Sequence, residues 1–438
     1  MERLTAIARA PGRITVSGAP AGFDAYAAAE AAIRSKGVVL FVAPDDARAM
    51  AAVETARFFA PALEVLYFPA WDCLPYDRVS PRADIESARL AALAALASRK
   101  DDAGSGLIVT TINALVQRVA PRESLAEASF LARAGADIDV EHLNRFLARN
   151  AYSRTGTVRE PGEFAPRGGI VDLWPPGAAE PLRLDFFGSH LETIRKFDAE
   201  SQLSTGTRES ITLLPATEAP LDPASISRFR SGYIAAFGGV TGEDPLYEAV
   251  SEGRKHAGME HWLPLFYEKL ETLFDYAGRV PVLLAPEIEE ARKARLELVH
   301  DYYATRHSMS EGKGHAASAP YKPIKPEALY LTDAEWEAAL AKRPVRLLSR
   351  FTAPDTPSST DAGGKPGRDF APERAQESSA ADDARINVFE SAVAHIRDLQ
   401  KRGLRVAVAC WSEGSAERMG GVLSDHGLIA IKRAADWR

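Results

Sequence analysis

The first predicted strand-to-helix turn, residues 17–25, is where nucleotide chemistry would be expected. A phosphate-binding loop of the form G-x-x-x-x-G-K-[ST] brings backbone N–H groups to the phosphates, neutralises them with lysine and holds Mg²⁺ through the hydroxyl. Here Gly18 and Gly22 are present, but the lysine and the following hydroxyl are missing, and Asp24 stands where the triphosphate would lie. A carboxylate there would repel the ligand. We therefore predict a degenerate loop, with no cofactor and no catalytic residue in this chain.

A loop around Trp71 holds a second group of reactive side chains. They are Asp72, Tyr76, Asp77, Arg78, Arg82 and Asp84. Paired carboxylates of this kind could serve acid–base chemistry or hold Mg²⁺. The same segment also suits a packed connection in which Trp71, Leu74 and Tyr76 dock against the core. We favour the packed connection, because a catalytic pair also needs a cleft and a ligand.

Histidine and cysteine spacing gives no sign of a metal centre. His256 and His261 flank a predicted turn, but zinc sites need tighter pairs with cysteine or carboxylate partners. Cys73 and Cys410 are far apart and fit neither a disulfide framework nor a metal site, as is usual in a reducing cytoplasm. We predict no metal site and a cytoplasmic location, and no apolar run reaches the roughly 18 residues that a membrane span needs.

Alternating strands and helices must position these side chains, and they predict a doubly wound parallel sheet. Residues 38–43 are an almost continuous apolar run, typical of a strand buried on both faces, and Asp45 or Asp46 suits the cap of the next helix. Further strands are expected at 14–16, 64–68, 107–111 and 280–284. Helices are expected at 24–35, 82–97, 125–131, 140–150, 226–236, 245–252, 266–273 and 287–305.

A β-meander is predicted between residues 163 and 198. Gly168-Gly169 and Pro175-Pro176-Gly177 bound a first short strand, and residues 182–187 alternate in polarity before a return strand. The alternation predicts one packed face and one exposed face. The exposed face would gather arginines, an aromatic ring and carboxylates, which is a composition typical of protein-binding hot spots. A solvated sheet face with one surplus aromatic would show the same pattern.

Four blocks of sequence carry a resemblance to a known family. They are residues 68–81, 109–118, the meander segments 167–175, 182–188 and 192–198, and residues 257–266. In this order they resemble the UvrA-binding domain and its surroundings, which the excision-repair protein UvrB shares with the transcription-repair coupling factor Mfd. UvrB keeps an intact phosphate-binding loop, so the degenerate turn at Asp24 points to the coupling-factor family.

The resemblance implies a site and a function. The family's contacts with UvrA fall on Arg167, Arg183, Phe187, Glu192 and Arg195. The implied role is an adaptor without chemistry of its own, which recruits UvrA to RNA polymerase stalled at a DNA lesion. RNA polymerase and DNA would be reached through domains that this chain lacks, and the full-length family member is an ATP-dependent DNA translocase.

The expected organisation is a helicase-like α/β domain interrupted by an inserted α+β domain. We assign residues 1–119 and 216–350 to the helicase-like domain, 120–215 to the insertion, 351–384 to a flexible linker, and 385–438 to the truncated start of a small α/β domain. In that last domain we expect a helix at 385–402, strands at 404–410 and 428–432, and a helix between them. The chain would then be the N-terminal part of a longer protein.

Two other function classes remain open on the sequence. One is an ATP-driven helicase or translocase, which the degenerate turn disfavours. The other is a DNA-binding module, which the formal charge of −7 disfavours, because sequence-independent DNA binding draws on many clustered lysines and arginines.

Overall fold

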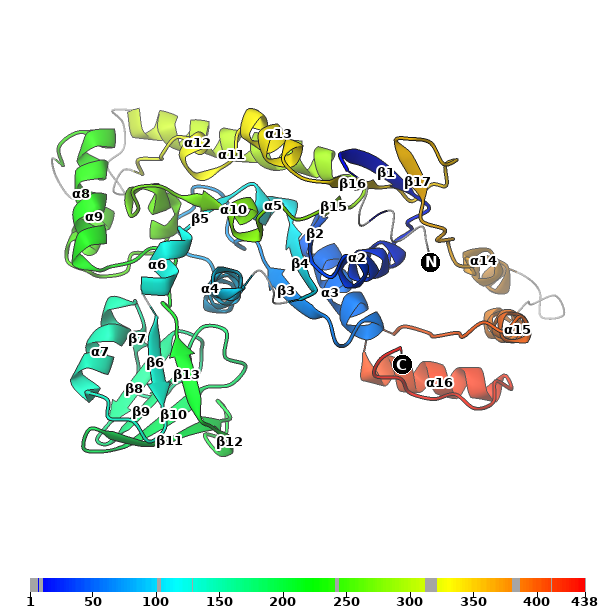
Figure 1. Cartoon of the computed structure of the whole chain (residues 1–438), viewed down its shortest axis with the longest axis horizontal. Helices are drawn as coiled ribbons and strands as arrows, with labels where there is room; N and C mark the ends of the chain where they lie inside the picture. Colours follow the sequence, from blue (N-terminus) through cyan, green and yellow to red (C-terminus); the bar gives the residue numbers. More distant parts are fainter. Residues whose placement is uncertain are drawn as a thin grey trace. The chain divides into compact units, whose positions relative to one another are not determined.

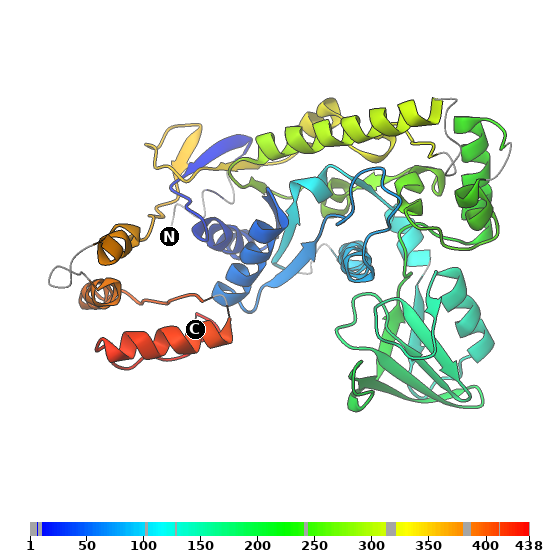
Figure 2. The same cartoon turned by 180° about the vertical axis from the view of Figure 1, so that it is seen from behind.

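The computed structural model describes residues 7, 11–100, 104–127, 129–240, 244–311, 321–379, 387–410 and 412–437 (Figures 1 and 2). The chain divides into two compact units, with the boundary between Gly364 and Lys365. No described helix is both long enough and apolar enough to cross a membrane.

The first unit contains a parallel sheet of seven strands in the order β17-β1-β16-β15-β2-β4-β3. Its strands are β1 (Arg13–Ser17), β2 (Val38–Ala43), β3 (Glu64–Phe68), β4 (Gly106–Thr111), β15 (Val282–Leu284), β16 (Val345–Leu348) and β17 (Ser359–Asp361). β2 is buried at five of its six positions because it lies between β15 and β4 and is covered on both faces. The α/β class and the parallel sheet are confirmed.

Helices cover this sheet, and some of them begin at capping residues. α2 (Phe23–Ser35) and α3 (Asp46–Phe59) pack against β2 and β4, and the Asp45 carboxylate accepts a hydrogen bond from the Arg48 N–H at the start of α3. The remaining helices of the main body are α4 (Ala83–Ser98), α5 (Ile112–Leu115), α8 (Pro223–Phe237), α9 (Pro245–Ser251), the 3₁₀ helix η1 (Met259–Leu265), α10 (Leu273–Ala277), α11 (Ile288–Glu311), α12 (Pro326–Leu329) and α13 (Asp333–Ala341).

Residues 122–213 form a separate sheet with its own core. Six strands are ordered β12-β11-β10-β9-β8-β7: β7 (Ser153–Arg154), β8 (Glu163–Arg167), β9 (Ile170–Leu173), β10 (Leu182–Phe187), β11 (His190–Phe197) and β12 (Ser204–Arg208). All neighbours are antiparallel except β7 and β8. α7 (Val140–Arg149) packs its Leu143 and Leu147 into a core that also contains Leu184 and Ile194. The predicted meander is therefore part of a wider mixed sheet.

Two predicted helices of the first unit are wrong in part. The helix expected at 125–131 ends early, because α6 covers Arg122–Glu127 and β6 (Phe130–Arg133) pairs with β13 (Ser210–Leu213). The helix expected at 266–273 is absent as such, since α10 begins only at Leu273. Its start is fixed by a capping box between Thr272 and Asp275.

A second short pairing, β5 (Arg118–Val119) with β14 (Glu271–Thr272), fixes the chain just before α10. As with β6 and β13, the two partners come from distant parts of the sequence. Pairing of this kind produces no local sequence pattern, so it cannot be predicted from one segment alone.

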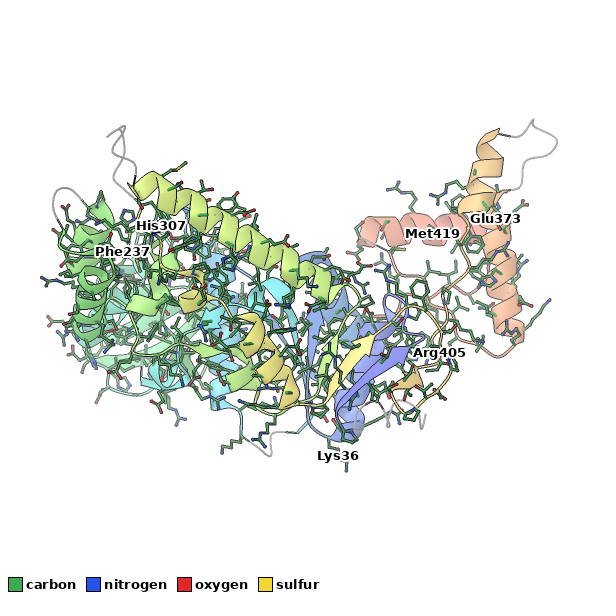
Figure 3. All side chains as sticks on the ribbon, turned by 90° about the horizontal axis from the view of Figure 1, so that it is seen from above. Lys36, Phe237, His307, Glu373, Arg405 and Met419 are labelled. Atoms are coloured by element: carbon green, nitrogen blue, oxygen red, sulfur yellow. The ribbon has the colours of Figure 1, made fainter. Side chains whose placement is uncertain are left out.

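The second unit contains α14 (Ala371–Ser379), α15 (Val388–Lys401) and α16 (Glu413–Asp425). α15 and α16 share a small core of Val393, Ile396 and Leu423, against which Met419 also packs (Figure 3). The strands predicted at 404–410 and 428–432 are wrong, because the described residues there form no ladder and Ile429 is 86% exposed. A strand is stable only when a neighbour takes up its hydrogen bonds, and none of the described residues does so for these two segments.

The segment expected to be a flexible linker, 351–384, contains regular structure. β17 adds a parallel strand to the main sheet beside β1, and α14 follows in the second unit. Residues 380–384 of that segment, and 385–386 of the next predicted helix, lie outside the described residues. Thr15, Val16 and Ser17 align with Ser359–Asp361, so this part of the segment belongs to the fold of the first unit.

Candidate protein-binding face and degenerate loop

The six-stranded sheet has one buried face and one partly open face, as the alternation in β10 predicts. Leu182, Leu184 and Phe186 point into the core between the sheet and α7, and Arg183 and Phe187 lie on the other face. We call this other face the partner face. It is formed by the outward residues of β8–β11 and contains the five residues singled out in the sequence.

Arg183 is held inside the partner face instead of extending into solvent. Its Nε and Nη2 donate to Asp172 Oδ1 and Oδ2 at 2.7 and 2.9 Å, and its side chain is only 19% exposed. Its guanidinium carbon also lies 5.0 Å from the ring centroid of Phe197. The paired carboxylate raises the pKa of Arg183, mainly through this hydrogen bond.

Arg195 lies directly opposite Arg183 in the register of β10 and β11. Its Nε donates to Asp185 Oδ2 at 2.8 Å, and the Thr193 hydroxyl donates to the same oxygen at 2.8 Å. Its side chain is 40% exposed, about twice as open as Arg183. The two arginines face each other across the strands, and each is neutralised by its own aspartate.

Phe187 and Glu192 flank the hairpin between β10 and β11. Phe187 is a large apolar side chain that is 79% exposed. The register of the hairpin shifts between Asp185 and Phe186, which leaves Glu192 as the extra residue of a β-bulge. Bulges change the direction of side chains, and both Glu192 and Phe187 are exposed.

Arg167 lies two strands away in the same face. The pairing of β8 with β9 and of β9 with β10 places Arg167, Ile170 and Asp185 in one row. Arg167 Nη2 donates to the backbone oxygen of Gly156 and, at 3.2 Å, to the Thr157 hydroxyl. The structure thus brings all five predicted residues onto one sheet.

A shallow hollow of about 460 Å³ lies near the end of this face where β9 begins and β10 ends. Its lining includes Gly169, Ile170, Asp185, Glu192 and Arg195. A β-carbon on Gly169 would lie 2.7 Å from the backbone oxygen of Phe186, so the close approach of the two strands requires glycine there. Sequence reasoning placed Asp185 on the same face as Arg183 but missed Asp172, whose single charge in an apolar strand could have revealed its pairing with Arg183.

The degenerate turn is filled by its own side chains. Asp24 Oδ1 accepts hydrogen bonds from the N–H groups of Gly22 and Ala25 at 2.9 and 2.8 Å, which are the helix N-terminal donors that a phosphate would use. Arg48 Nη2 lies 2.5 Å from Asp24 Oδ2, and the Asp24 side chain is 2% exposed. A buried carboxylate therefore takes the place of an anionic ligand at the start of α2.

The segment after β17 covers the same turn. Ala362 N–H donates to the Ser17 oxygen at 2.8 Å, and Gly364 N–H donates to the Gly18 oxygen at 2.9 Å. Gly18 has a φ of +62°, and a β-carbon on it would clash with the Asp361 carboxylate. The turn is therefore covered by the segment after β17 and filled by the Asp24 side chain.

The loop around Trp71 is a packed connection. Trp71 and Tyr76 are buried, and Trp71 Nε1 donates to Glu218 Oε1 at 2.9 Å. The expected docking of Leu74 is wrong, because that side chain is 46% exposed. Arg82 is exposed and donates a hydrogen bond to Asp84, which lies in the first turn of α4. This hydrogen bond lowers the pKa of Asp84.

A buried ion pair joins α4 to the segment that returns from the inserted sheet. Arg89 Nε donates to Glu218 Oε1 at 2.5 Å, and both side chains are fully buried. Arg89 Nη1 also donates to the Pro69 oxygen at 2.8 Å. Nearby, Glu86 accepts from the Thr217 hydroxyl at 3.3 Å, and burial followed by repulsion from Glu260 raises the pKa of Glu86 to about 8.

His261 lies in the same region and is almost fully buried between Trp71 and Tyr76. Burial lowers the pKa of His261 to about 4. Among the described residues, no group of three or more histidine, cysteine or carboxylate side chains is placed to hold a metal ion.

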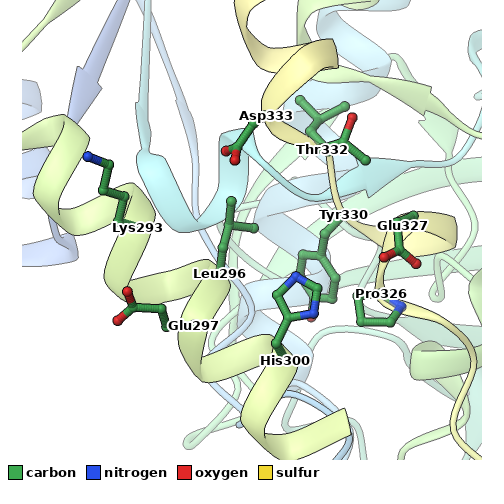
Figure 4. A pocket seen from close by; sticks show the side chains of 10 residues that line it. Lys293, Leu296, Glu297, His300, Pro326, Glu327, Tyr330, Thr332 and Asp333 are labelled. Carbon is green, nitrogen blue, oxygen red and sulfur yellow. The ribbon is translucent and has the colours of Figure 1, made fainter. Parts of the chain in front are cut away.

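A surface cleft of about 360 Å³ lies between α11 and the α12–α13 turn (Figure 4). Lys293, Glu297 and His300 line it from α11, and Glu327 and Asp333 line it from α12 and α13. Asp333 is already paired with Arg292 at 2.5 Å. None of the residues predicted from the sequence lies in this cleft.

The fold defines a class of protein: an α/β body that carries an inserted mixed sheet. Comparison with known proteins is specific on this point. Residues 131–218 match the family model described as the UvrB interaction domain. The matched residues include the whole six-stranded sheet.

Similarity to curated proteins extends over more than half of the chain. The chain is 33% identical over 304 residues to the transcription-repair-coupling factor of Rickettsia bellii, and the match covers 69% of this chain and 26% of that protein. For the factors of Haemophilus influenzae and Escherichia coli the identity is 36% over 259 and 249 residues, covering 58% and 57% of this chain and 22% and 21% of those proteins. The chain spans about a quarter of the length of these relatives and is consistent with their N-terminal region.

Proposed function

We propose that this chain is the adaptor portion of a transcription-repair coupling factor, which recruits UvrA to stalled RNA polymerase in transcription-coupled nucleotide excision repair. The observation that carries the proposal is the partner face within the segment that matches the UvrB interaction domain. Phe187, with 79% of its surface exposed, supplies an apolar anchor, and the paired arginines beside it supply polar contacts. This combination is enriched in protein-binding hot spots.

The five residues divide into two roles on this face. Phe187, Glu192, Arg195 and Arg167 are open enough to touch UvrA directly. Arg183 is mostly buried, so only the exposed part of its fixed guanidinium can contact UvrA. Arginine forks suit this purpose because they can bind a second acceptor while one edge stays paired.

The adaptor role needs no chemistry in this chain. Asp24 and Arg48 fill the turn where a nucleotide phosphate would bind, which supports binding of UvrA without ATP. RNA polymerase and DNA would be reached through other regions of the longer relatives, in the cytoplasm. The ATP-dependent translocase activity would also belong to those regions.

Isothermal titration calorimetry of the chain with purified UvrA, without nucleotide, tests this proposal. We expect saturable binding, and we expect Arg167→Ala, Arg183→Ala and Arg195→Ala each to weaken it by about tenfold, which corresponds to roughly 1.4 kcal/mol. The matched control is Arg133→Ala, an exposed arginine on β6 outside the six-stranded sheet. Absence of binding by the unaltered chain, or equal loss in the control, would overturn the proposal.

A further inference from the structure

Asp172 is a buried carboxylate in the middle of the partner face. Its side chain is 1% exposed, and it lies on β9 directly opposite Arg183 on β10. Both of its oxygens accept from the Arg183 guanidinium, at 2.7 and 2.9 Å. A charge enclosed to this degree is tolerated only when it is paired and hydrogen-bonded, so Asp172 and Arg183 depend on each other.

The surroundings of the pair are apolar. Ala165 lies opposite Asp172 on β8, and Ala165, Val158 and Phe197 form a small buried cluster with Trp174 packed against it. The Arg183 guanidinium lies over the Phe197 ring, 5.0 Å from its centroid. Its edge is thus held by a carboxylate and its plane by an aromatic ring, which removes the rotamer freedom that an exposed arginine retains.

Arg183 also needs this anchor because of its other neighbour. The register of β10 and β11 puts it directly opposite Arg195, and like charges facing each other across strands are destabilising. Asp185 takes the charge of Arg195, and Asp172 takes the charge of Arg183 from the opposite side. Without Asp172, repulsion and the loss of its hydrogen bonds would both turn Arg183 away from its present position.

We propose that Asp172 is a positioning residue of the partner face, which fixes Arg183 so that the exposed part of its guanidinium meets UvrA in one orientation. The inference rests on the proposed function, because it assigns UvrA as the partner. Asp172 itself is too enclosed to touch a partner and acts through Arg183.

Asp172→Asn tests the inference, since it keeps the size of the side chain and removes the charge. We expect the affinity for UvrA to fall about tenfold. We also expect the Arg183 Nε–H signal in a ¹H–¹⁵N spectrum, assigned by its loss in Arg183→Gln, to broaden or to exchange with water much faster. The matched control is Glu180→Gln, which removes a half-exposed carboxylate that pairs with Lys196 in the same sheet; affinity and signal should stay unchanged.

A double-mutant cycle separates positioning from a general structural role. In an Arg183→Gln background, Asp172→Asn should change the affinity by less than twofold, because there is no guanidinium left to position. Independent, multiplying losses would overturn the inference. Arg183→Lys serves if Asp172→Asn does not fold: it keeps the charge but not the fork, and it should bind UvrA about tenfold more weakly than the parent chain, whereas parent-like affinity would also overturn the inference.

Failure of the proposed function can be told apart from failure of this inference. If the unaltered chain does not bind UvrA, the proposed function is wrong. The Arg183 Nε–H signal still decides whether Asp172 fixes the guanidinium, and a signal that is the same in Asp172→Asn as in the parent chain would overturn the inference by itself.

Discussion

Arg48 on α3 holds the carboxylate of Asp24 at the start of α2, with Nη2 and Oδ2 2.5 Å apart. The same carboxylate also accepts from the N–H groups of Gly22 and Ala25. One aspartate in the first turn of α2 therefore binds two backbone N–H groups and neutralises an arginine. The Asp24 carboxylate thus contributes to the stability of the first unit.

Replacing Asp24 by alanine should destabilise the protein by about 2 kcal/mol, because it leaves Arg48 without its partner and the helix donors without an acceptor. Urea unfolding followed by circular dichroism measures the change. We expect no ATP binding by the variant in equilibrium dialysis, since lysine and the hydroxyl are still missing. Nucleotide binding by Asp24→Ala would show that the aspartate alone had closed the site.

Phe187→Ala should reduce UvrA affinity by about thirtyfold, the effect of losing a hot-spot anchor of roughly 2 kcal/mol, and should leave the unfolding free energy within about 0.5 kcal/mol. The ring is 79% exposed, so it contributes little to the core. Calorimetry and thermal unfolding measure the two quantities. Leu131→Ala is the control, because Leu131 is 62% exposed on β6 of the same domain. Equal weakening in both variants would argue against an anchor at Phe187.

Arg89→Met should destabilise the first unit by roughly 3–5 kcal/mol, because it leaves the fully buried Glu218 carboxylate without a charge partner. Chemical denaturation measures this loss. The double variant with Glu218→Gln should recover at least half of it, since no unpaired charge then remains in the core. If the double variant is no more stable than the single one, lost packing and not the unpaired charge is the cause.

Because of Glu86, we expect the free energy of unfolding to fall as the pH rises. Burial raises the pKa of Glu86 from 4.5 to about 8, so the folded protein binds a proton that the unfolded chain releases between these values. Its contribution is fully present below about pH 4.5 and is lost as the pH rises through about 8. Buried Glu260, whose pKa burial also raises, acts in the same direction.

Unfolding free energies at pH 5 and pH 8.5 test this expectation. Glu86→Gln imitates the protonated form and should reduce the loss between these pH values by at least about 1 kcal/mol, given roughly 1.4 kcal/mol for each pKa unit. Glu54→Gln, an exposed carboxylate on α3, is the control and should keep the parent slope. A Glu86→Gln slope equal to that of the parent would show that Glu86 is ionised in the folded state at both pH values.

Much of the fold follows from short-range patterns. The apolar run at 38–43 and the alternation at 182–187 have the bounds of β2 and β10, because a strand's side-chain period is set within the strand itself. Asp45 caps α3 for an equally local reason, as its side chain reaches the N–H three residues on. The absence of a lysine from the turn at residues 17–25 is evident from the sequence alone.

Pairing between distant segments lies beyond such patterns. Residues 130 and 131 fall within the helix expected at 125–131 but lie on β6, which pairs with residues 210–213. Residues 359–361 lie in a composition typical of a linker but pair with β1. Residues 404–410 are apolar enough for a buried strand, yet no described neighbour takes up their hydrogen bonds. In each case the deciding hydrogen-bond partner lies far away in the sequence, or is not provided.

The candidate site shows the same division. By itself the sequence determined which residue types occupy the outward positions of β10 and β11, since alternation fixes the face on which a side chain lies. Only the tertiary structure decided that Arg183 is clamped by Asp172 over Phe197 while Phe187 stays open, because those contacts depend on the register of neighbouring strands and on what covers the face.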